Sequence, residues 1–163
     1  MASQNDPHYV LYVFPFSLYS IMVRFTLALG NTYYKPSRGL VVENRLVNLH
    51  EDEEMTEWYL KINPKGQVPA MTANVLPSPM PDSLDMSYHF VEHYYPGLLP
   101  EAHRQLIQDL LSKIHDIEGS SLTIKEPRKE LTIEVPNPGL DELLARTDIS
   151  NEYRRALEYK KEL

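Results

Sequence analysis

The sequence contains no cysteine, and this absence limits its chemistry before any motif is considered. A chain without cysteine forms no disulfide and has no thiolate for a metal, no cysteine nucleophile and no dithiol redox centre. Any thiol that takes part in its chemistry must therefore come from a ligand.

Long apolar runs and dense basic stripes are also missing. No stretch approaches the roughly 18 consecutive apolar residues of a membrane span, and residues 1–7 lack the basic and apolar regions of a secretory signal. The formal net charge of -7 disfavours polyanionic partners. We therefore expect a cytoplasmic protein with no nucleic acid or membrane partner.

The composition that is present is that of a globular protein. The 163 residues are 42% hydrophobic and 24% charged, enough for one ordinary domain and a small second one. The pattern changes from mixed to purely helical near residues 96–101. We expect one domain over residues 8–97 and a second, helical one over residues 101–163.

Strand-like and helix-like segments alternate in the first domain. The expected elements are a strand at 10–14, a helix at 20–29, a strand at 40–49, a helix at 56–62, a strand at 68–72 and a helix at 82–95. Ser20 is the expected cap of the first helix, which Gly30 would end. Strand, helix, strand in this order predicts a parallel pair joined by a crossover.

The second domain begins with a strong helical signal and then weakens. Apolar residues from Leu106 to Ile117 recur at helical spacing and predict a long amphipathic helix from Glu101. A polar, proline-containing stretch follows. The last expected helix, residues 150–163, has little apolar material of its own.

The segment Asn63–Ala70, N-P-K-G-Q-V-P-A, is the most specific feature. X-Pro bonds are the ones that adopt the cis form, and a proline that opens a strand donates nothing to its ladder. A cis Pro69 would turn the Val68 backbone N–H and C=O outward, where an extended peptide pairs as an added strand. The alternative is a simple proline turn before an edge strand.

Two further positions have the chemistry of a peptide site. Asp82 and Ser83 open a helix, where the amides and the positive dipole end attract anions, so Ser83 would hold a carboxylate while Asp82 faces an ammonium. Ser17 precedes the first helix, where a hydroxyl would stabilise a thiolate. The alternatives are an ordinary N-cap and an ordinary loop serine.

A competing motif lies in the helix at 82–95. His89 and His93, with Glu92 between them, fit the H-x-x-E-H spacing of inverted zinc peptidases. That chemistry requires a further carboxylate ligand on another helix, and no such element is obvious. We expect a histidine pair on a partly solvated face, and no metal.

The sequence resembles the glutathione transferases over about residues 9–117. The resemblance rests on the loop serine, the N-P-x-G-x-V-P-A segment, the D-S pair before a helix that ends in Y-P, and the L-L-P that follows. The tail at 148–160 resembles a segment of fungal members. The resemblance implies an α/β fold with a thioredoxin-like N-terminal domain of βαβ-α-β-α order and a partial all-α C-terminal region. It also implies glutathione as cosubstrate, an electrophilic small molecule as second substrate, and a homodimer.

The same resemblance assigns residue roles. Ser17 matches the serine that contacts the glutathione sulfur in serine-type members, and Ser20 is an alternative thiol contact. Tyr12 and Tyr19 would be tyrosine-type alternatives, but we expect them to pack. The residues implied to bind glutathione are Lys65 and Gln67 at the glycyl carboxylate, Val68 and Pro69 at the cysteinyl backbone, and Asp82 and Ser83 at the γ-glutamyl end.

Two departures from the family pattern keep other functions open. Members usually have a complete helical domain that carries the electrophile site, whereas only residues 101–163 remain here. The loop at 73–81 has three prolines where a fourth strand is expected, so that sheet edge should be short or irregular. The alternatives are a non-catalytic module of the same fold, used for dimerisation or partner binding, and a partial gene product with a sticky face at 106–117.

Overall fold

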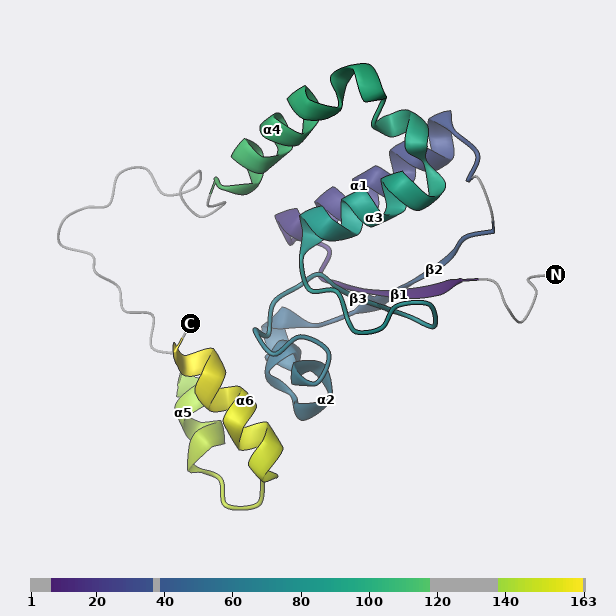
Figure 1. The fold of residues 1–163 in the computed structure, drawn as a ribbon. Helices are drawn as coiled ribbons and strands as arrows, with labels where there is room; N and C mark the ends of the chain where they lie inside the picture. The colour runs from purple at the N-terminus through teal and green to yellow at the C-terminus, as the bar shows by residue number, and fades with distance from the viewer. Residues whose placement is uncertain (1–6, 37–38, 118–137, 163) are drawn as a thin grey trace, which may run out of the picture.

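The sheet of this computed structural model, which describes residues 7–36, 39–117 and 138–162, has three strands within those ranges. Strand β1 (His8–Val13) lies between β2 (Val41–Leu46) and β3 (Ala70–Ala73). It runs parallel to β2 and antiparallel to β3 (Figure 1). The predicted parallel pair with a helical crossover is confirmed.

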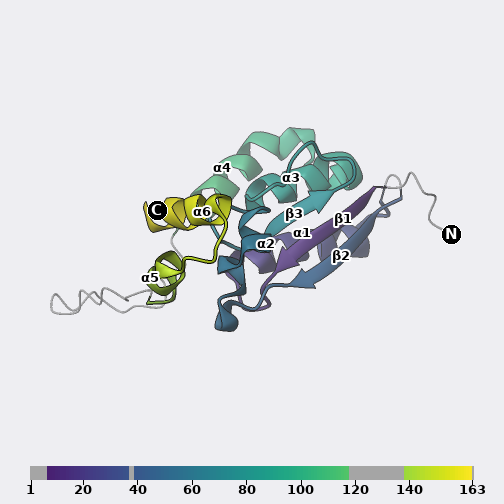
Figure 2. The same cartoon turned by 90° about the horizontal axis from the view of Figure 1, so that it is seen from below.

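Helices cover both faces of this sheet. Helices α1 (Leu18–Tyr33) and α3 (Ser83–Tyr94) pack side by side on one face, and the short α2 (Glu57–Leu60) lies on the other (Figures 1 and 2). Side chains alternate along β1, as strand geometry requires. Its odd-numbered residues therefore enter the core under α1 and α3, while Tyr12 packs with Tyr59 on the α2 side.

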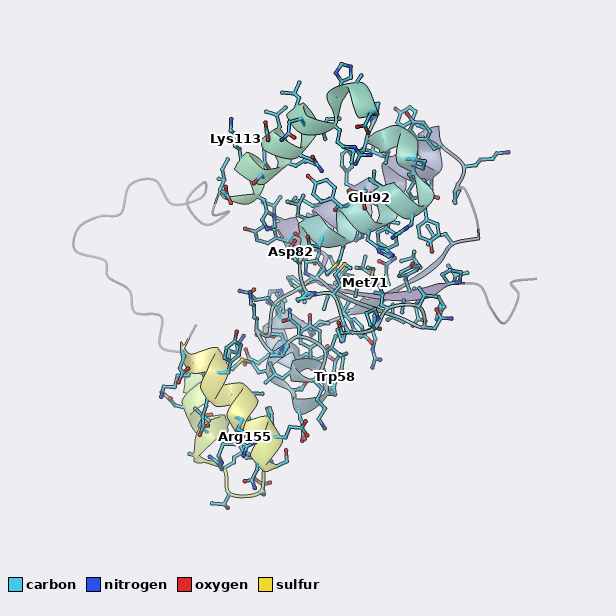
Figure 3. The ribbon with its side chains drawn as sticks, viewed as in Figure 1. Trp58, Met71, Asp82, Glu92, Lys113 and Arg155 are labelled. Carbon is cyan, nitrogen blue, oxygen red and sulfur yellow. The ribbon has the colours of Figure 1, made fainter. Side chains whose placement is uncertain are left out.

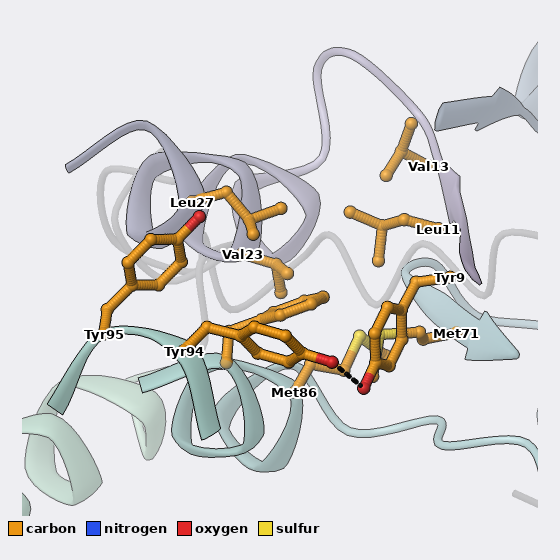
Figure 4. Packing of buried hydrophobic residues seen from close by; sticks show 10 residues of the cluster. Tyr9, Leu11, Val13, Val23, Leu27, Met71, Met86, Tyr94 and Tyr95 are labelled. Atoms are coloured by element: carbon orange, nitrogen blue, oxygen red, sulfur yellow. Dashed lines mark hydrogen bonds between the residues drawn. The ribbon is translucent and has the colours of Figure 1, made fainter. Parts of the chain in front are cut away.

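The larger core is rich in tyrosine and methionine. Tyr9 from β1 and Tyr94 from α3 are fully buried, and their hydroxyls share a hydrogen bond of 2.9 Å (Figure 4). A buried phenol needs such a partner because an unpaired hydroxyl in an apolar interior is costly. Met71 and Met86 fill the space beside this pair.

Helix α1 is longer than predicted and begins earlier. The Ser17 side chain caps it by accepting a hydrogen bond from the Ser20 amide, so the expected cap at Ser20 is wrong. Gly30 lies inside the helix instead of ending it. A Cβ at Gly30 would lie 2.5 Å from the Tyr95 ring, so the glycine allows that ring to pack on the helix backbone.

The other boundaries shift by a few residues. The second strand ends at Leu46, and the third begins after Pro69. Beyond β3, Met71 pairs with Met80 through an isolated antiparallel bridge and not through a fourth strand of normal length. The short, irregular sheet edge expected from the prolines is confirmed.

The C-terminal region consists of α4 (Arg104–His115), α5 (Pro138–Ala145) and α6 (Asn151–Glu162). No side chain of α4 is fully buried. Helix α5 was not predicted, and α6 follows Ser150, whose side chain accepts a hydrogen bond from the Tyr153 amide. No helix in the described ranges combines the length and apolarity needed to cross a bilayer.

The last helix buries more apolar side chain than the sequence predicts. Tyr153 and Leu157 of α6 are buried in a small cluster with Met55 and Leu60, which belong to the segment around α2. The Tyr153 hydroxyl also donates a hydrogen bond to the Met55 carbonyl. The last helix therefore packs on the segment around α2 through a small apolar cluster.

Candidate functional site

A groove of about 500 Å³ lies where the loop after β1, the turn before β3 and the start of α3 meet the end of α4. All seven site residues proposed from the sequence line this groove: Ser17, Lys65, Gln67, Val68, Pro69, Asp82 and Ser83. The other lining residues are Tyr19, Leu49, Glu54, Gly66, Pro81 and His115. The fold thus brings together residues that lie far apart in the sequence.

Ser17 and Val68 contact each other in the lining of this groove. The Ser17 hydroxyl donates a hydrogen bond of 3.4 Å to the Val68 carbonyl and accepts one of 3.3 Å from the Ser20 amide. The Val68–Pro69 peptide bond is cis, which is the first of the two alternatives that the sequence left open. Ser17 is half-buried at the first turn of α1, which contains no acidic residue. The local field therefore favours a negative group at this point.

The turn before Val68 is held by hydrogen bonds from behind. The Gln67 carbonyl accepts 2.7 Å hydrogen bonds from both the Tyr59 hydroxyl and the Asn63 side-chain amide. The Asn63 side-chain oxygen accepts a further one from the Lys65 amide. Burial raises the pKa of Tyr59, so its phenol remains a proton donor. These contacts orient the turn that carries Lys65 and Gln67.

Asp82 lies at the start of α3 (Figure 3), and its two carboxylate oxygens have different contacts. One carboxylate oxygen caps the helix by accepting hydrogen bonds from the Leu84 and Asp85 amides, at 2.8 and 3.0 Å. The other lies 3.4 Å from Nε2 of His115. Asp82 is therefore an N-cap, as the alternative interpretation has it. Its second carboxylate oxygen lies beside His115, another groove residue.

Three buried side-chain polar atoms lack a hydrogen-bond partner among the described residues, and all three belong to groove residues. They are Oε2 of Glu54, Oγ of Ser83 and Nδ1 of His115. Ser83 is only 3% exposed. Because buried polar groups normally have partners, the Ser83 hydroxyl in this groove points to a polar ligand that supplies its partner.

Glu54 and His115 were not identified as site residues from the sequence. His115 arrives from α4, and its ring packs edge to face on Tyr19 at 5.4 Å between centroids. Burial raises the pKa of Glu54, although its backbone amide and Lys160 oppose the shift. Neither residue lies in a local motif, so only the folded chain reveals them.

The alternative thiol contacts fall into different environments. Ser20 is buried outside the groove, and its hydroxyl accepts a hydrogen bond from the Phe14 amide. Tyr12 packs against Trp58 and Tyr59. Tyr19 lines the groove. Of these three residues, only Tyr19 is among those that line the groove.

The H-x-x-E-H segment belongs to packing and surface contacts. Nε2 of His89 lies 2.8 Å from the Tyr9 hydroxyl, and the His89 and His93 ring centroids are 4.6 Å apart. Glu92 lies 3.7 Å from the Arg104 guanidinium. Within residues 7–36, 39–117 and 138–162, no group of three or more His, Asp or Glu side chains is arranged to hold a metal.

Comparison with known proteins identifies both a family and a fold. The family model described as "Glutathione S-transferase, N-terminal domain" matches residues 11–97, more than half of the chain. No curated protein matches the chain. Structures of glutathione transferases do match.

Three of these structures, all from insects, illustrate the similarity. An epsilon-class glutathione S-transferase from the housefly Musca domestica is 24% identical, with 69% of this chain and 49% of that chain covered and a TM-score of 0.58. A glutathione transferase homologue from Drosophila mojavensis with bound glutathione is 20% identical, with coverage of 96% and 64% and a TM-score of 0.59. A diazinon-metabolizing glutathione S-transferase from the silkworm Bombyx mori is 20% identical, with coverage of 83% and 65% and a TM-score of 0.59.

These similarities establish the fold. The N-terminal part has the thioredoxin-like fold of this family, and a mostly helical region follows it. The chain spans between 49% and 65% of the length of the three proteins. The predicted fold class is confirmed.

Proposed function

Because this chain belongs to the glutathione S-transferase N-terminal domain family, we propose that it binds glutathione in the groove and stabilises the thiolate for attack on an electrophilic small molecule. One observation carries the proposal. The buried hydroxyl of Ser83, which lacks a hydrogen-bond partner in the described part of the chain, belongs to the lining of the groove.

The γ-glutamyl end of glutathione has an ammonium and a carboxylate on one carbon. Ser83 has a buried hydroxyl with no partner among the described residues, at the N-terminus of α3, where a carboxylate is electrostatically favoured. The Asp82 carboxylate oxygen that is not used in capping attracts the ammonium. Two adjacent residues thus complement both charges of this end.

The cysteinyl part would lie along Val68. A ligand amide that donates to the Val68 carbonyl competes with the 3.4 Å hydrogen bond from Ser17. The freed Ser17 hydroxyl then points its hydrogen at the ligand sulfur. Lowering the pKa of a thiol by one to two units takes about 1.4 to 2.7 kcal/mol, which a charge-assisted hydrogen bond and the N-terminus of α1 supply together.

The reaction follows from this placement. The thiol proton leaves to solvent, and the sulfur electron pair forms a bond to the electrophilic carbon, whose leaving group departs with its own electron pair. The protein contributes positioning and electrostatic stabilisation, not a nucleophile. Ser17 makes this a serine-type site within the proposal. The fungal likeness of residues 148–160, the cytoplasmic location and the homodimer stay predictions.

The glycyl end has a mixed charge environment. Lys65 and Gln67 are exposed at this part of the groove and would reach the glycyl carboxylate. Glu54 lies in the same lining, and its carboxylate repels another one. We expect this end to contribute less to affinity than the γ-glutamyl end.

A non-catalytic module of the same fold is the second candidate, and one observation favours it. The Ser17 hydroxyl both caps α1 and donates to Val68, so it must exchange a partner before it contacts a sulfur. Isothermal titration with glutathione, followed by an assay with a generic aromatic halide, separates the candidates. Binding with turnover supports the transferase, binding without turnover selects the module, and no binding overturns the proposed site.

A further inference from the structure

The last helix reaches the turn that carries two of the proposed glutathione contacts. Nζ of Lys160, near the end of α6, donates hydrogen bonds to the backbone carbonyls of Gly66 at 3.0 Å and Lys65 at 3.2 Å. The Lys160 side chain is half-buried there. A charged donor that spans two consecutive carbonyls fixes their direction as well as their position.

Helix α6 is itself firmly joined to the segment around α2. Leu157 is fully buried and Tyr153 nearly so, in the cluster with Met55 and Leu60. At the other end of the helix, the Ser150 hydroxyl donates to the Glu57 carboxylate at 2.9 Å. Lys160 therefore extends from a rigid base, not from a loose tail.

Gly66 is the residue that admits this contact. Its φ of +56° lies in the left-handed region that glycine adopts without strain. A Cβ at this position would lie 2.5 Å from Lys160 Nζ and 3.0 Å from the Glu54 carbonyl oxygen. The turn thus presents bare backbone to the lysine.

The charges around Lys160 fit a fixed internal contact. Burial lowers the pKa of Lys160, while Glu54 and Asp52 act in the opposite direction and favour the ammonium form. Glu54 also lines the groove, so the ammonium lies near its wall. The same turn is fixed from its other side, where Tyr59 and Asn63 donate to the Gln67 carbonyl.

We propose that Lys160 is a positioning residue of the groove, through which α6 holds residues 65–67 so that the side chains of Lys65 and Gln67 face the glycyl end of the ligand. The proposal rests on the proposed glutathione site. It gives the C-terminal region a specific role, because the last helix braces one wall of the groove through Lys160.

The test compares three variants of the full chain. Lys160→Met removes the ammonium, Lys160→Arg retains a donor, and Lys161→Met is the matched control because Lys161 pairs with Asp141 on the exposed side. Titrations use glutathione and γ-glutamylcysteine, the dipeptide without glycine. Amide hydrogen exchange of residues 65–67 is measured without ligand.

We expect Lys160→Met to speed exchange at residues 65–67 and to weaken glutathione binding about tenfold, the loss of one charged hydrogen-bond contact. Binding of γ-glutamylcysteine should weaken much less, because this dipeptide does not reach Lys65 and Gln67. Lys160→Arg should keep most of the glutathione affinity and most of the protection from exchange at residues 65–67. Lys161→Met should match the unmodified protein in both measurements.

Other outcomes overturn the proposal in distinguishable ways. Unchanged exchange at residues 65–67 in Lys160→Met removes Lys160 from its positioning role. Equal losses for the tripeptide and the dipeptide indicate general destabilisation. Failure of the unmodified protein to bind either peptide overturns the proposed function, while the exchange measurement still decides whether α6 braces the turn.

Discussion

The Ser17 hydroxyl and the Val68 carbonyl, 51 residues apart, are joined by a hydrogen bond of 3.4 Å. This bond ties the loop after β1 to the turn before β3. It also brings the proposed thiolate-stabilising group next to the proposed backbone partner of the cysteinyl moiety. The proposed role of each groove residue can be tested by substitution.

The first prediction concerns Ser17→Ala. The change removes both the helix cap and the hydroxyl donor, so the free energy of unfolding should fall by about 1 kcal/mol. The pKa of the bound glutathione thiol should rise by about one to two units because a charge-assisted hydrogen bond is lost. Ultraviolet absorbance of the thiolate across a pH titration measures the second effect.

Ser17→Thr is the control for this prediction, since it retains the hydroxyl and the capping oxygen. It should leave thiolate absorbance at neutral pH close to that of the unmodified protein. If Ser17→Ala loses stability but leaves the thiolate signal unchanged, Ser17 is only a helix cap.

Ser83→Ala should separate stability from binding. The Ser83 hydroxyl is buried and has no partner within residues 7–36, 39–117 and 138–162, so its removal should raise the free energy of unfolding by about 1 kcal/mol. Denaturant titration measures this change. The same change should weaken glutathione binding about tenfold, because the ligand carboxylate loses its donor.

Ser87→Ala is the matched control for Ser83. The Ser87 hydroxyl already donates to the Ser83 carbonyl at 2.8 Å. Its removal should lower stability by about 1 kcal/mol and leave glutathione affinity nearly unchanged. A loss of stability in Ser83→Ala would show that its hydroxyl contributes to the unliganded fold.

Asp82→Asn tests the ammonium contact while keeping the cap. Asparagine caps helices as well as aspartate, so stability should change little. Glutathione affinity should fall about tenfold, whereas a deaminated glutathione should bind both forms equally. Isothermal titration measures the affinity for both ligands.

Asp85→Asn, an exposed change in the same turn, is the control and should leave the affinity for both ligands unchanged. If both variants weaken glutathione binding equally, the effect comes from the charge near the N-terminus of α3 and not from a contact with Asp82.

Glu54→Gln has a pH-dependent outcome. Burial raises the pKa of Glu54 above its ordinary 4.5, so the ionised carboxylate is less favourable in the folded state than in the unfolded one. The variant should therefore be more stable than the unmodified protein at neutral pH, and the difference should shrink as the pH falls toward 4.5. Denaturant titrations at several pH values measure it.

The same substitution should tighten glutathione binding at neutral pH, because repulsion of the glycyl carboxylate is removed. Glu51→Gln, an exposed change in the neighbouring turn, is the control and should alter neither property. A decrease in affinity for Glu54→Gln would indicate that the carboxylate accepts a hydrogen bond from the ligand.

Much of the site was predictable because its parts are local. The proline after Val68 opens the third strand, and Asp82 caps the helix that follows, both as backbone preferences within a few residues require. The seven predicted lining residues follow from these motifs and from the family resemblance. Ser20 was wrongly chosen as a cap, because the turn after Pro15 places the first helical amides three residues earlier.

Other parts had no local signal. His115 and Lys160 are ordinary residues of amphipathic helices, and nothing in their neighbourhoods marks a site. Gly30 resembled a helix end, but its role depends on the distant Tyr95 ring. Such functions are defined by partners that lie far away in the sequence.

The amino-acid sequence alone determined the order of strands and helices as far as α3 and the helix start at Asp82, because these depend on backbone preferences over a few residues. Only the tertiary structure decided that His115 at the end of α4 lines the groove and that Lys160 of α6 donates a hydrogen bond to the Gly66 carbonyl. Burial and hydrogen-bond satisfaction are properties of the packed chain, so they are set by contacts that no short segment contains.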